Sequence, residues 1–123
     1  MLKCKSVHAK AQQEDGYRIL VDLFWPEGLK TRETYVDEWL QELGPSYDLQ
    51  RFHFSTPNWE KYKSKYVEEM LSSNHKKKLL AEIAKKSQNG DVTLLYGNED
   101  PLHNHAVILK EIIENNFFKH DKS

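Results

Sequence analysis

The chain has 123 residues, with 18 basic and 19 acidic side chains and a formal net charge of -1. This balance gives no electrostatic attraction toward nucleic acid or an acidic membrane. A single cysteine cannot form an intramolecular disulfide, and no stretch approaches the roughly 20 apolar residues of a membrane span. We therefore expect a cytoplasmic protein of one domain, residues 1–123, with a loose tail over the last few residues.

The first third of the chain predicts two strands and a helix. Residues 2–9, LKCKSVHA, indicate a strand, and residues 17–25, YRILVDLFW, indicate a second one. The nearly continuous apolar run of the second strand suits a strand that is covered on both faces. A helix is then predicted over residues 34–43, where apolar side chains recur at helical spacing behind Thr34 as the capping residue.

Helices dominate the rest of the chain. A short strand could cover residues 49–54, and a helix is predicted from Thr56 and Pro57 as the N-cap and first helical residue. After the break at Ser-Ser-Asn, three more elements follow. They are a helix over residues 75–86 that ends at Asn89-Gly90, a strand over residues 91–97, and a helix that opens at Asp100-Pro101 and runs to Phe117.

This alternation predicts an α/β fold, with a small, mostly parallel β-sheet of three or four strands covered by about four helices. Ligands of such sheets gather at the carboxyl ends of the strands, where helix N-termini also point. Two loops follow strands at that end, residues 25–33 and residues 97–105. We therefore expect any site to lie where these loops meet.

The second loop carries two histidines, His103 and His105. Residues two apart in a helix point about 200° apart, so the pair could not chelate one ion if both were helical. No spacing marks Asp100, Asp22 or His53 as a third ligand, and we predict no metal site. In the first turn of a helix, His103 would be held neutral by the dipole and suited to acid–base catalysis. The alternative is that His103 only hydrogen-bonds within its loop and that His105 is exposed.

Asp22 is the one carboxylate in the apolar run of residues 17–25. An aspartate there is costly to bury unless it is paired or hydrogen-bonded. One interpretation makes it an acid–base group or the partner that orients a histidine. The alternative makes it a structural carboxylate that binds the amides of the following turn or pairs with Arg18. Trp25 could cover a planar ligand, or it could pack in the core.

Two further features are expected to be structural. Trp59, Tyr62 and Tyr66 recur at helical spacing, which is typical of a buried stripe rather than a base-stacking platform. Cys4 has no helix start or basic cluster beside it and is expected to be a small buried hydrophobe, not a nucleophile.

Four motifs taken together resemble, in order and spacing, the YeaO-like branch of the domain-of-unknown-function 488 family. They are YRILVDLFWPEGL, DEWLQELGPS, TPNWEKYKSKYVEEM and VTLLYGNEDPLHNHAVIL, within roughly residues 17–110. The family motif Val-Asp-Arg-Leu-Trp-Pro-Arg-Gly is matched at Asp22, Trp25, Pro26 and Gly28. The last-strand motif is matched at Thr93, Leu94, Leu95, Tyr96, Asp100, His103, Asn104 and Ala106.

The resemblance implies a cytoplasmic α/β protein of bacteria or archaea whose family has no established activity. A longer branch has a Cys-His-Arg cluster near the position of His103 to His105, which implies a shared pocket; this chain has neither that cysteine nor that arginine. Leu23 and Glu27 stand where the family usually has arginines. Because arginine forks grip phosphate, their loss argues against a pocket for a strong anion.

Two classes of function remain open. In the first, the chain is a hydrolase or transferase acting on a small, nucleotide-like molecule, with His103 carrying the proton and Asp22 orienting it or acting as the second acid–base group. The substrate-binding residues would then be Trp25, Tyr96, Asp100 and Asn104. In the second, the chain is a non-catalytic module that binds a ligand or a protein. The sequence identifies no cofactor. It argues against membrane and nucleic-acid partners and leaves both a small-molecule ligand and a homo-oligomer open.

Overall fold

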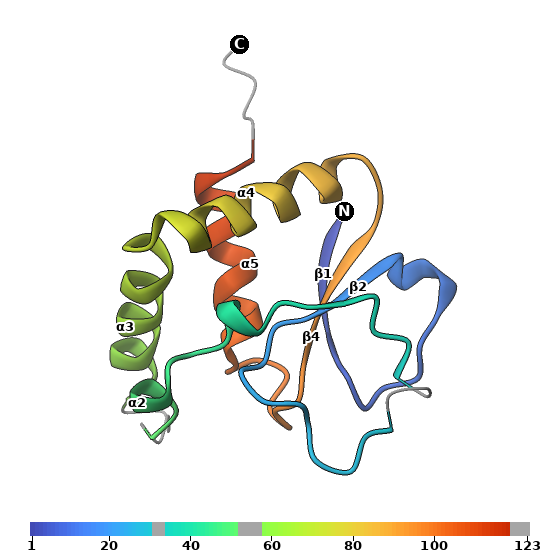
Figure 1. Cartoon of the computed structure of the whole chain (residues 1–123), viewed down its shortest axis with the longest axis horizontal. Helices are drawn as coiled ribbons and strands as arrows, with labels where there is room; N and C mark the ends of the chain where they lie inside the picture. The colour runs from blue at the N-terminus through green and yellow to red at the C-terminus, as the bar shows by residue number, and fades with distance from the viewer. Residues whose placement is uncertain (31–33, 52–57, 119–123) are drawn as a thin grey trace.

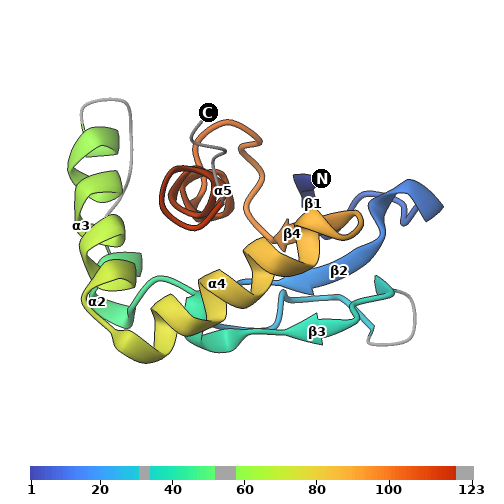
Figure 2. The same cartoon turned by 90° about the horizontal axis from the view of Figure 1, so that it is seen from above.

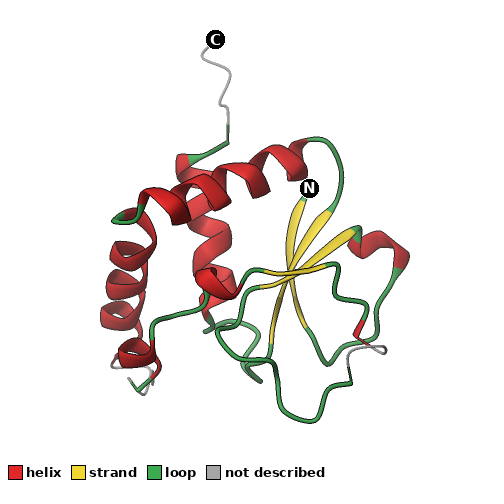
Figure 3. Ribbon diagram, in the orientation of Figure 1, coloured by secondary structure: helices red, strands yellow, loops and turns green. Residues whose placement is uncertain are grey.

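A computed structural model describes residues 1–30, 34–51 and 58–118 (Figure 1). Within these ranges the chain forms both strands and helices, as Figure 3 shows, and the predicted α/β class is confirmed. The strands are β1 (Leu2–Ser6), β2 (Tyr17–Leu20), β3 (Glu38–Trp39) and β4 (Val92–Tyr96). The helices are α2 (Tyr47–Gln50), α3 (Trp59–Leu71), α4 (Asn74–Gln88) and α5 (His105–Asn116), with short 3-10 turns η1 (Gln13–Asp15) and η2 (Gln41–Leu43).

The four strands form one parallel sheet in the order β1-β4-β2-β3. β4 is an inner strand, and Val92 is paired with Leu2 on one side and with Tyr17 on the other. Every residue of β4 is buried. Its sequence is VTLLY, in which Thr93 is the one residue that is not apolar. Such a sequence is typical of a strand that is covered on both faces.

One face of the sheet is covered by helices. α5 packs against β1 and β4, α4 packs against β4, and α3 packs on α4 and α5 rather than on the sheet. In Figures 1 and 2, α3 accordingly stands apart from the strands, with α5 between them. The main core lies between these layers and includes Ile19, Leu94, Leu80, Leu109 and Ile113.

The apolar side chains on the opposite face are covered by residues from loop segments. Val7, Leu20 and Leu95 are buried there, and Trp25, Leu29 and Val36 are among the side chains that pack against them. The loop that follows β2 therefore closes the second face of the sheet.

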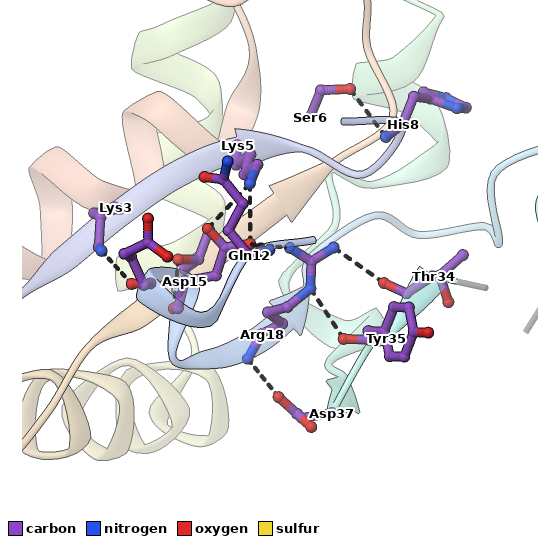
Figure 4. A network of polar contacts seen from close by, with 12 residues as sticks. Lys3, Lys5, Ser6, His8, Gln12, Asp15, Arg18, Thr34, Tyr35 and Asp37 are labelled. Atoms are coloured by element: carbon purple, nitrogen blue, oxygen red, sulfur yellow. Dashed lines mark hydrogen bonds and ion pairs between the residues drawn. The ribbon is translucent and has the colours of Figure 1, made fainter. Parts of the chain in front are cut away.

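A buried network of charges occupies the other end of this second face (Figure 4). Arg18 lies 2.5 Å from Asp15, and Lys5 lies 3.0 Å from the same carboxylate. The guanidinium also donates to the backbone carbonyls of Thr34 and Tyr35. Arg18 is thus committed to Asp15 and to the segment before β3, so the suggested pairing of Arg18 with Asp22 is wrong.

The predicted helix over residues 34–43 is wrong. Its middle forms β3, whose residues pair with Ile19 and Leu20 of β2, and η2 follows. The Asp37 N–H donates to the Arg18 carbonyl, and the Asp37 carboxylate accepts from the Arg18 N–H. Helical spacing of apolar residues was present, but the unpaired edge of β2 supplies hydrogen bonds that outweigh this local preference.

α3 and α4 lie where they were predicted. The short strand predicted over residues 49–54 is wrong for its described part, residues 49–51. Residues 49 and 50 belong to α2, which Ser46 caps by accepting from the Leu49 N–H. Residues 52–57, including the predicted cap Thr56 and Pro57, lie outside the described residues. α4 is capped by Ser73, and its C-cap is Asn89, as the Asn-Gly signal predicted.

The last helix begins four residues later than predicted, with His105 rather than Pro101 as its first residue. α5 starts at His105, and Asn104 is its N-cap, with a side chain that accepts from the Val107 N–H. Asp100 instead forms its own turn, because its carboxylate accepts from the backbone of Leu102. The strand predicted over residues 17–25 is also shorter and ends at Leu20. In the described ranges, the helices are too short or too polar to cross a membrane.

Candidate cleft at the carboxyl end of the sheet

The N-terminal ends of α3 and α5 point to the same end of the molecule as the carboxyl ends of the strands (Figure 1). A cleft of about 250 Å³ opens there. It is lined by Asp22, Leu23, Phe24, Pro45, Gln50, Tyr62, Asn98 and His105. These residues come from the segment after β2, the region of α2, the start of α3, the loop after β4 and the first position of α5.

Asp22 connects the segment after β2 to the loop after β4. Its Oδ2 accepts from the Gly97 N–H at 2.9 Å. A Cβ added at residue 97 would lie 2.8 Å from Asp22 Oδ2, so a larger residue there would require the carboxylate to shift. The other oxygen, Oδ1, is buried and accepts no hydrogen bond from a described residue.

His105 lies beside Asp22 but directs its proton elsewhere. Its Nε2 is 2.9 Å from the Val21 carbonyl oxygen and 3.0 Å from Asp22 Oδ1. A carbonyl can only accept, so Nε2 carries a proton and donates it to Val21. The Nε2–H of His105 therefore points at the Val21 carbonyl and not at Asp22 Oδ1. For this reason Oδ1 lies 3.0 Å from a donor nitrogen and still accepts no hydrogen bond from it.

An aromatic ladder on α3 supports both histidines. Tyr62 stacks between Trp59 and Tyr66, with ring centroids 5.8 Å and 6.4 Å away. His103 meets Trp59 edge-on at 4.9 Å, and His105 meets Tyr66 edge-on at 5.9 Å. Burial, reinforced by nearby acidic groups, raises the pKa of Tyr62 and of Tyr66. Tyr62, which lines the cleft, therefore keeps its hydroxyl proton at neutral pH.

Asp100 and His103 form a separate, half-exposed pair. Asp100 Oδ1 accepts from the Leu102 and His103 N–H groups, and Oδ2 lies 3.1 Å from His103 Nδ1. The backbone hydrogen bond from Leu102 and the contacts with His103 lower the pKa of Asp100. His103 is not among the described residues that line the cleft. The structure thus shows the loop hydrogen bonding that was the alternative for His103, while His105, expected to be exposed in that alternative, is only 8% exposed.

The other predicted substrate-binding residues are not among the described residues that line the cleft. Asn104 is fully buried, caps α5 and donates from its Nδ2 to the Asp100 carbonyl. Tyr96 is buried in the main core, and burial raises its pKa. Trp25 donates to the Leu29 carbonyl and packs on the second face of the sheet. Of the predicted set, only Asp22 lines the cleft.

Sequence reasoning did not select His105, Tyr62, Gln50 or Asn98 for this cleft. For His105 a usable signal existed, because Asn104 is a good N-cap residue and would have put His105 in the first helical position. Tyr62 belongs to the stripe that was assigned to the core, and it is indeed buried, but it also lines the cleft.

Across the described ranges, no group of three His, Cys, Asp or Glu side chains is arranged to hold a metal ion. His53, considered as a third ligand, lies outside those ranges.

Fold and cleft together define a small α/β protein with an Asp–His pair at the carboxyl end of a parallel sheet. The chain belongs to the domain-of-unknown-function 488 family, and the model that matches residues 1–123 is that of the inactive DUF488-N3 subclade. It is 39% identical over 111 residues to the uncharacterized protein YeaO of Escherichia coli (strain K12), covering 89% of this chain and 94% of the relative. The predicted YeaO-like membership is confirmed.

Two mycobacterial relatives are more distant. The uncharacterized proteins Rv3073c of Mycobacterium tuberculosis (strain ATCC 25618 / H37Rv) and Mb3100c of Mycobacterium bovis (strain ATCC BAA-935 / AF2122/97) are each 28% identical over 108 residues. Each match covers 87% of this chain and 88% of the relative. No solved structure shows significant similarity to the chain.

Proposed function

We propose that this protein binds a small molecule in the cleft between Asp22, Tyr62 and His105 without turning it over, and that it does so in the cytoplasm. The observation that carries the proposal is the buried Oδ1 of Asp22, which accepts no hydrogen bond from a described residue. An unsatisfied buried acceptor costs about 1–3 kcal/mol. A ligand that donates to this oxygen would recover that free energy on binding.

The arrangement supports binding more than acid–base catalysis. The Nε2 proton of His105 is held by the Val21 carbonyl, and Asp22 Oδ2 is held by Gly97. The predicted proton carrier His103 is bound to Asp100. General acid–base catalysis needs both a proton donor and a proton acceptor that face the substrate, and among these groups only the acceptor Asp22 Oδ1 has no hydrogen bond from a described residue. The description of the matching subclade as inactive supports the same reading.

The test is a thermal-shift screen of the purified protein against neutral and cationic small molecules. Phe24 lines the cleft and is 55% exposed, so Phe24→Ala should remove a wall without unfolding the protein. Tyr47, 65% exposed and absent from the cleft lining, provides the matched control Tyr47→Ala. A ligand at 100 times its Kd should stabilise the wild type by about 2.7 kcal/mol.

A ligand whose effect is lost in Phe24→Ala and kept in Tyr47→Ala would support the proposal. A ligand that stabilises both variants equally, or a library without a single binder, would contradict it.

A second candidate, an acid–base hydrolase or transferase, is favoured by one observation. Asp22 Oδ1 and His105 Nε2 lie 3.0 Å apart at the wall of the same cleft. Each ligand from the screen should therefore be incubated with the protein and examined for product by mass spectrometry. Product that forms with the wild type and not with His105→Gln would establish the enzyme and refute the non-catalytic proposal.

A further inference from the structure

The polar groups of the cleft differ in what they still have to bond. Asp22 Oδ1 is an acceptor without a donor. Gln50 donates its Nε2 to the Pro45 carbonyl, which leaves Oε1 as a second acceptor. Asn98 accepts from the Asp100 N–H with Oδ1, which leaves its Nδ2 as a donor. A matching ligand presents N–H donors together with an acceptor.

The charge of the cleft restricts the ligand further. None of the described residues that line it is a lysine or an arginine, and the Nε2 proton of His105 is held by Val21. Asp22 contributes a negative charge at the wall. A phosphate would meet this carboxylate without the cationic donors that usually bind it. The ligand is therefore uncharged at this point, or carries a donor, and is not an anion.

Size and shape complete the description. A volume of about 250 Å³ is below the roughly 300–1,000 Å³ of sites for drug-sized ligands, so one small ring system fills it. Phe24 and Tyr62 supply aromatic surface, and Leu23 and Pro45 supply aliphatic surface. Such walls suit the faces of a planar ring more than a flexible alkyl chain.

From these three features we infer that the ligand is an uncharged planar heterocycle of nucleobase size whose exocyclic amino group donates to Asp22 Oδ1. The inference rests on the proposed binding function and names its ligand class. The chemistry is that by which protein carboxylates accept from the N4 amino group of cytosine. Asn98 and Gln50 would meet the adjoining ring positions.

The first experiment compares ligands on the wild-type protein by calorimetric titration. Cytosine and adenine carry the amino group, while uracil and hypoxanthine carry a carbonyl oxygen at the same ring position. We expect the amino compounds to bind about tenfold more tightly or better than their carbonyl partners. The 5′-monophosphates of the same bases should bind more weakly than the free bases.

The second experiment reverses the hydrogen bond with Asp22→Asn. Because the Gly97 N–H needs an acceptor, it holds the side-chain carbonyl of the new asparagine in the place of Oδ2. The amide nitrogen then takes the place of Oδ1 and offers a donor. We expect the preference to invert, with uracil or hypoxanthine bound more tightly than cytosine or adenine.

The outcomes separate the two proposals. Suppose that a base binds the wild type, that Phe24→Ala abolishes this binding, and that its affinity depends neither on the amino group nor on Asp22→Asn. The cleft then binds ligands, and the inferred ligand class is wrong. Tighter binding of the monophosphates than of the free bases would also overturn the class. If none of the bases binds and other molecules from the screen bind in a Phe24-dependent manner, the class again fails alone. If nothing binds, both proposals fail. The comparison of ligands on the wild type needs no variant, so it decides the inference even if Asp22→Asn does not fold.

Discussion

His103 and His105 are separated by one residue and have opposite environments, because α5 begins between them. Asn104 caps the helix, so His103 lies before the cap on the protein surface and His105 occupies the first helical position inside. His105 donates to Val21 and packs on Tyr66, whereas His103 pairs with an exposed carboxylate. Truncation of His105 therefore leaves a buried cavity and an unpaired carbonyl, whereas truncation of His103 leaves a surface carboxylate in contact with water.

Truncation of the two histidines should separate these environments. We expect His105→Ala to lower the free energy of unfolding by about 2–4 kcal/mol, since it opens a cavity and leaves the Val21 carbonyl without its donor. His103→Ala should cost less than about 1 kcal/mol, as surface changes usually do. Urea denaturation measures both, with the exposed His75→Ala as control. Equal losses at residues 103 and 105 would contradict the assignment.

At the scale of single residues, the sequence predicted that Asp22 needs hydrogen-bonding partners, but it did not predict which groups these are. A lone carboxylate in an apolar run requires hydrogen bonds, and this was read correctly from residues 17–25. Gly97, which donates to Asp22, is 75 residues away in the chain (97 − 22). His105, which contacts Asp22, is 83 residues away (105 − 22). No local pattern encodes such pairs.

Among the elements, local signals sufficed where they had no competitor. Ser73 begins α4 and Asn89 ends it, as side-chain capping and chain termination predict. At Asp100-Pro101 two outcomes were compatible with the same cap signal, and the carboxylate closes a turn in place of a helix. Over residues 34–43, the helical pattern lost to the open edge of β2.

The cap of α5 gives the prediction at this scale. Asn104→Ala removes the acceptor of the Val107 N–H and the donor to the Asp100 carbonyl. We expect a loss of about 2–3 kcal/mol in the free energy of unfolding, more than the roughly 1 kcal/mol expected for Ser73→Ala at α4. Amide hydrogen exchange should accelerate in the first turn of α5. If Asp100→Ala were the more damaging variant, the helix would begin where the sequence first suggested.

At the scale of the whole molecule, the basic and acidic side chains are balanced in number, and some of them form a buried ionic group of Lys5, Asp15 and Arg18. Asp15 and Arg18 are both about 95% buried, being 5% and 4% exposed, and Lys5 joins them. Arg18 also holds the carbonyls of Thr34 and Tyr35, so this group ties β2 to the chain that leads into β3. Burial alone would raise the pKa of Asp15, but hydrogen bonds from the Gln12 backbone and from Lys5 and Arg18 lower it below 3.8.

This shift predicts a loss of stability in acid. A carboxyl whose pKa is lower in the folded protein stabilises the fold fully above its unfolded value of 3.8, and the contribution disappears as the pH falls through the lower folded value. Asp15→Asn should cost about 3 kcal/mol or more near pH 7, because it leaves Arg18 buried without its counter-ion. Its stability should then fall less steeply than that of the wild type below pH 3.8. Urea midpoints against pH test this, with the half-exposed Asp91→Asn as control; parallel curves for Asp15→Asn and the wild type would refute it.

The architecture could be predicted from the sequence, whereas the cleft could not. Three of the four strands and α3 and α4 follow from apolar runs, spacing and caps, and with them the α/β class. The cleft combines side chains from Asp22, Gln50, Tyr62, Asn98 and His105, each on a different segment. Which of them face one another depends on how α3 and α5 pack at the end of the sheet, and packing at long range leaves no local pattern.

The strand order has a consequence for how the chain folds. β1 and β2 lie on either side of β4, so they form no hydrogen bonds with each other in the sheet. β2 ends at Leu20 and β4 begins at Val92, which is 72 residues later (92 − 20). Until residues 92–96 have been synthesised, β2 has only the two-residue β3 beside it and β1 has no strand neighbour in the sheet. Closing so long a loop precedes any gain from strand pairing, which makes folding slow compared with that of local helical proteins. Assembly of the sheet therefore waits for β4, and the nascent chain carries unpaired strand edges for most of its synthesis.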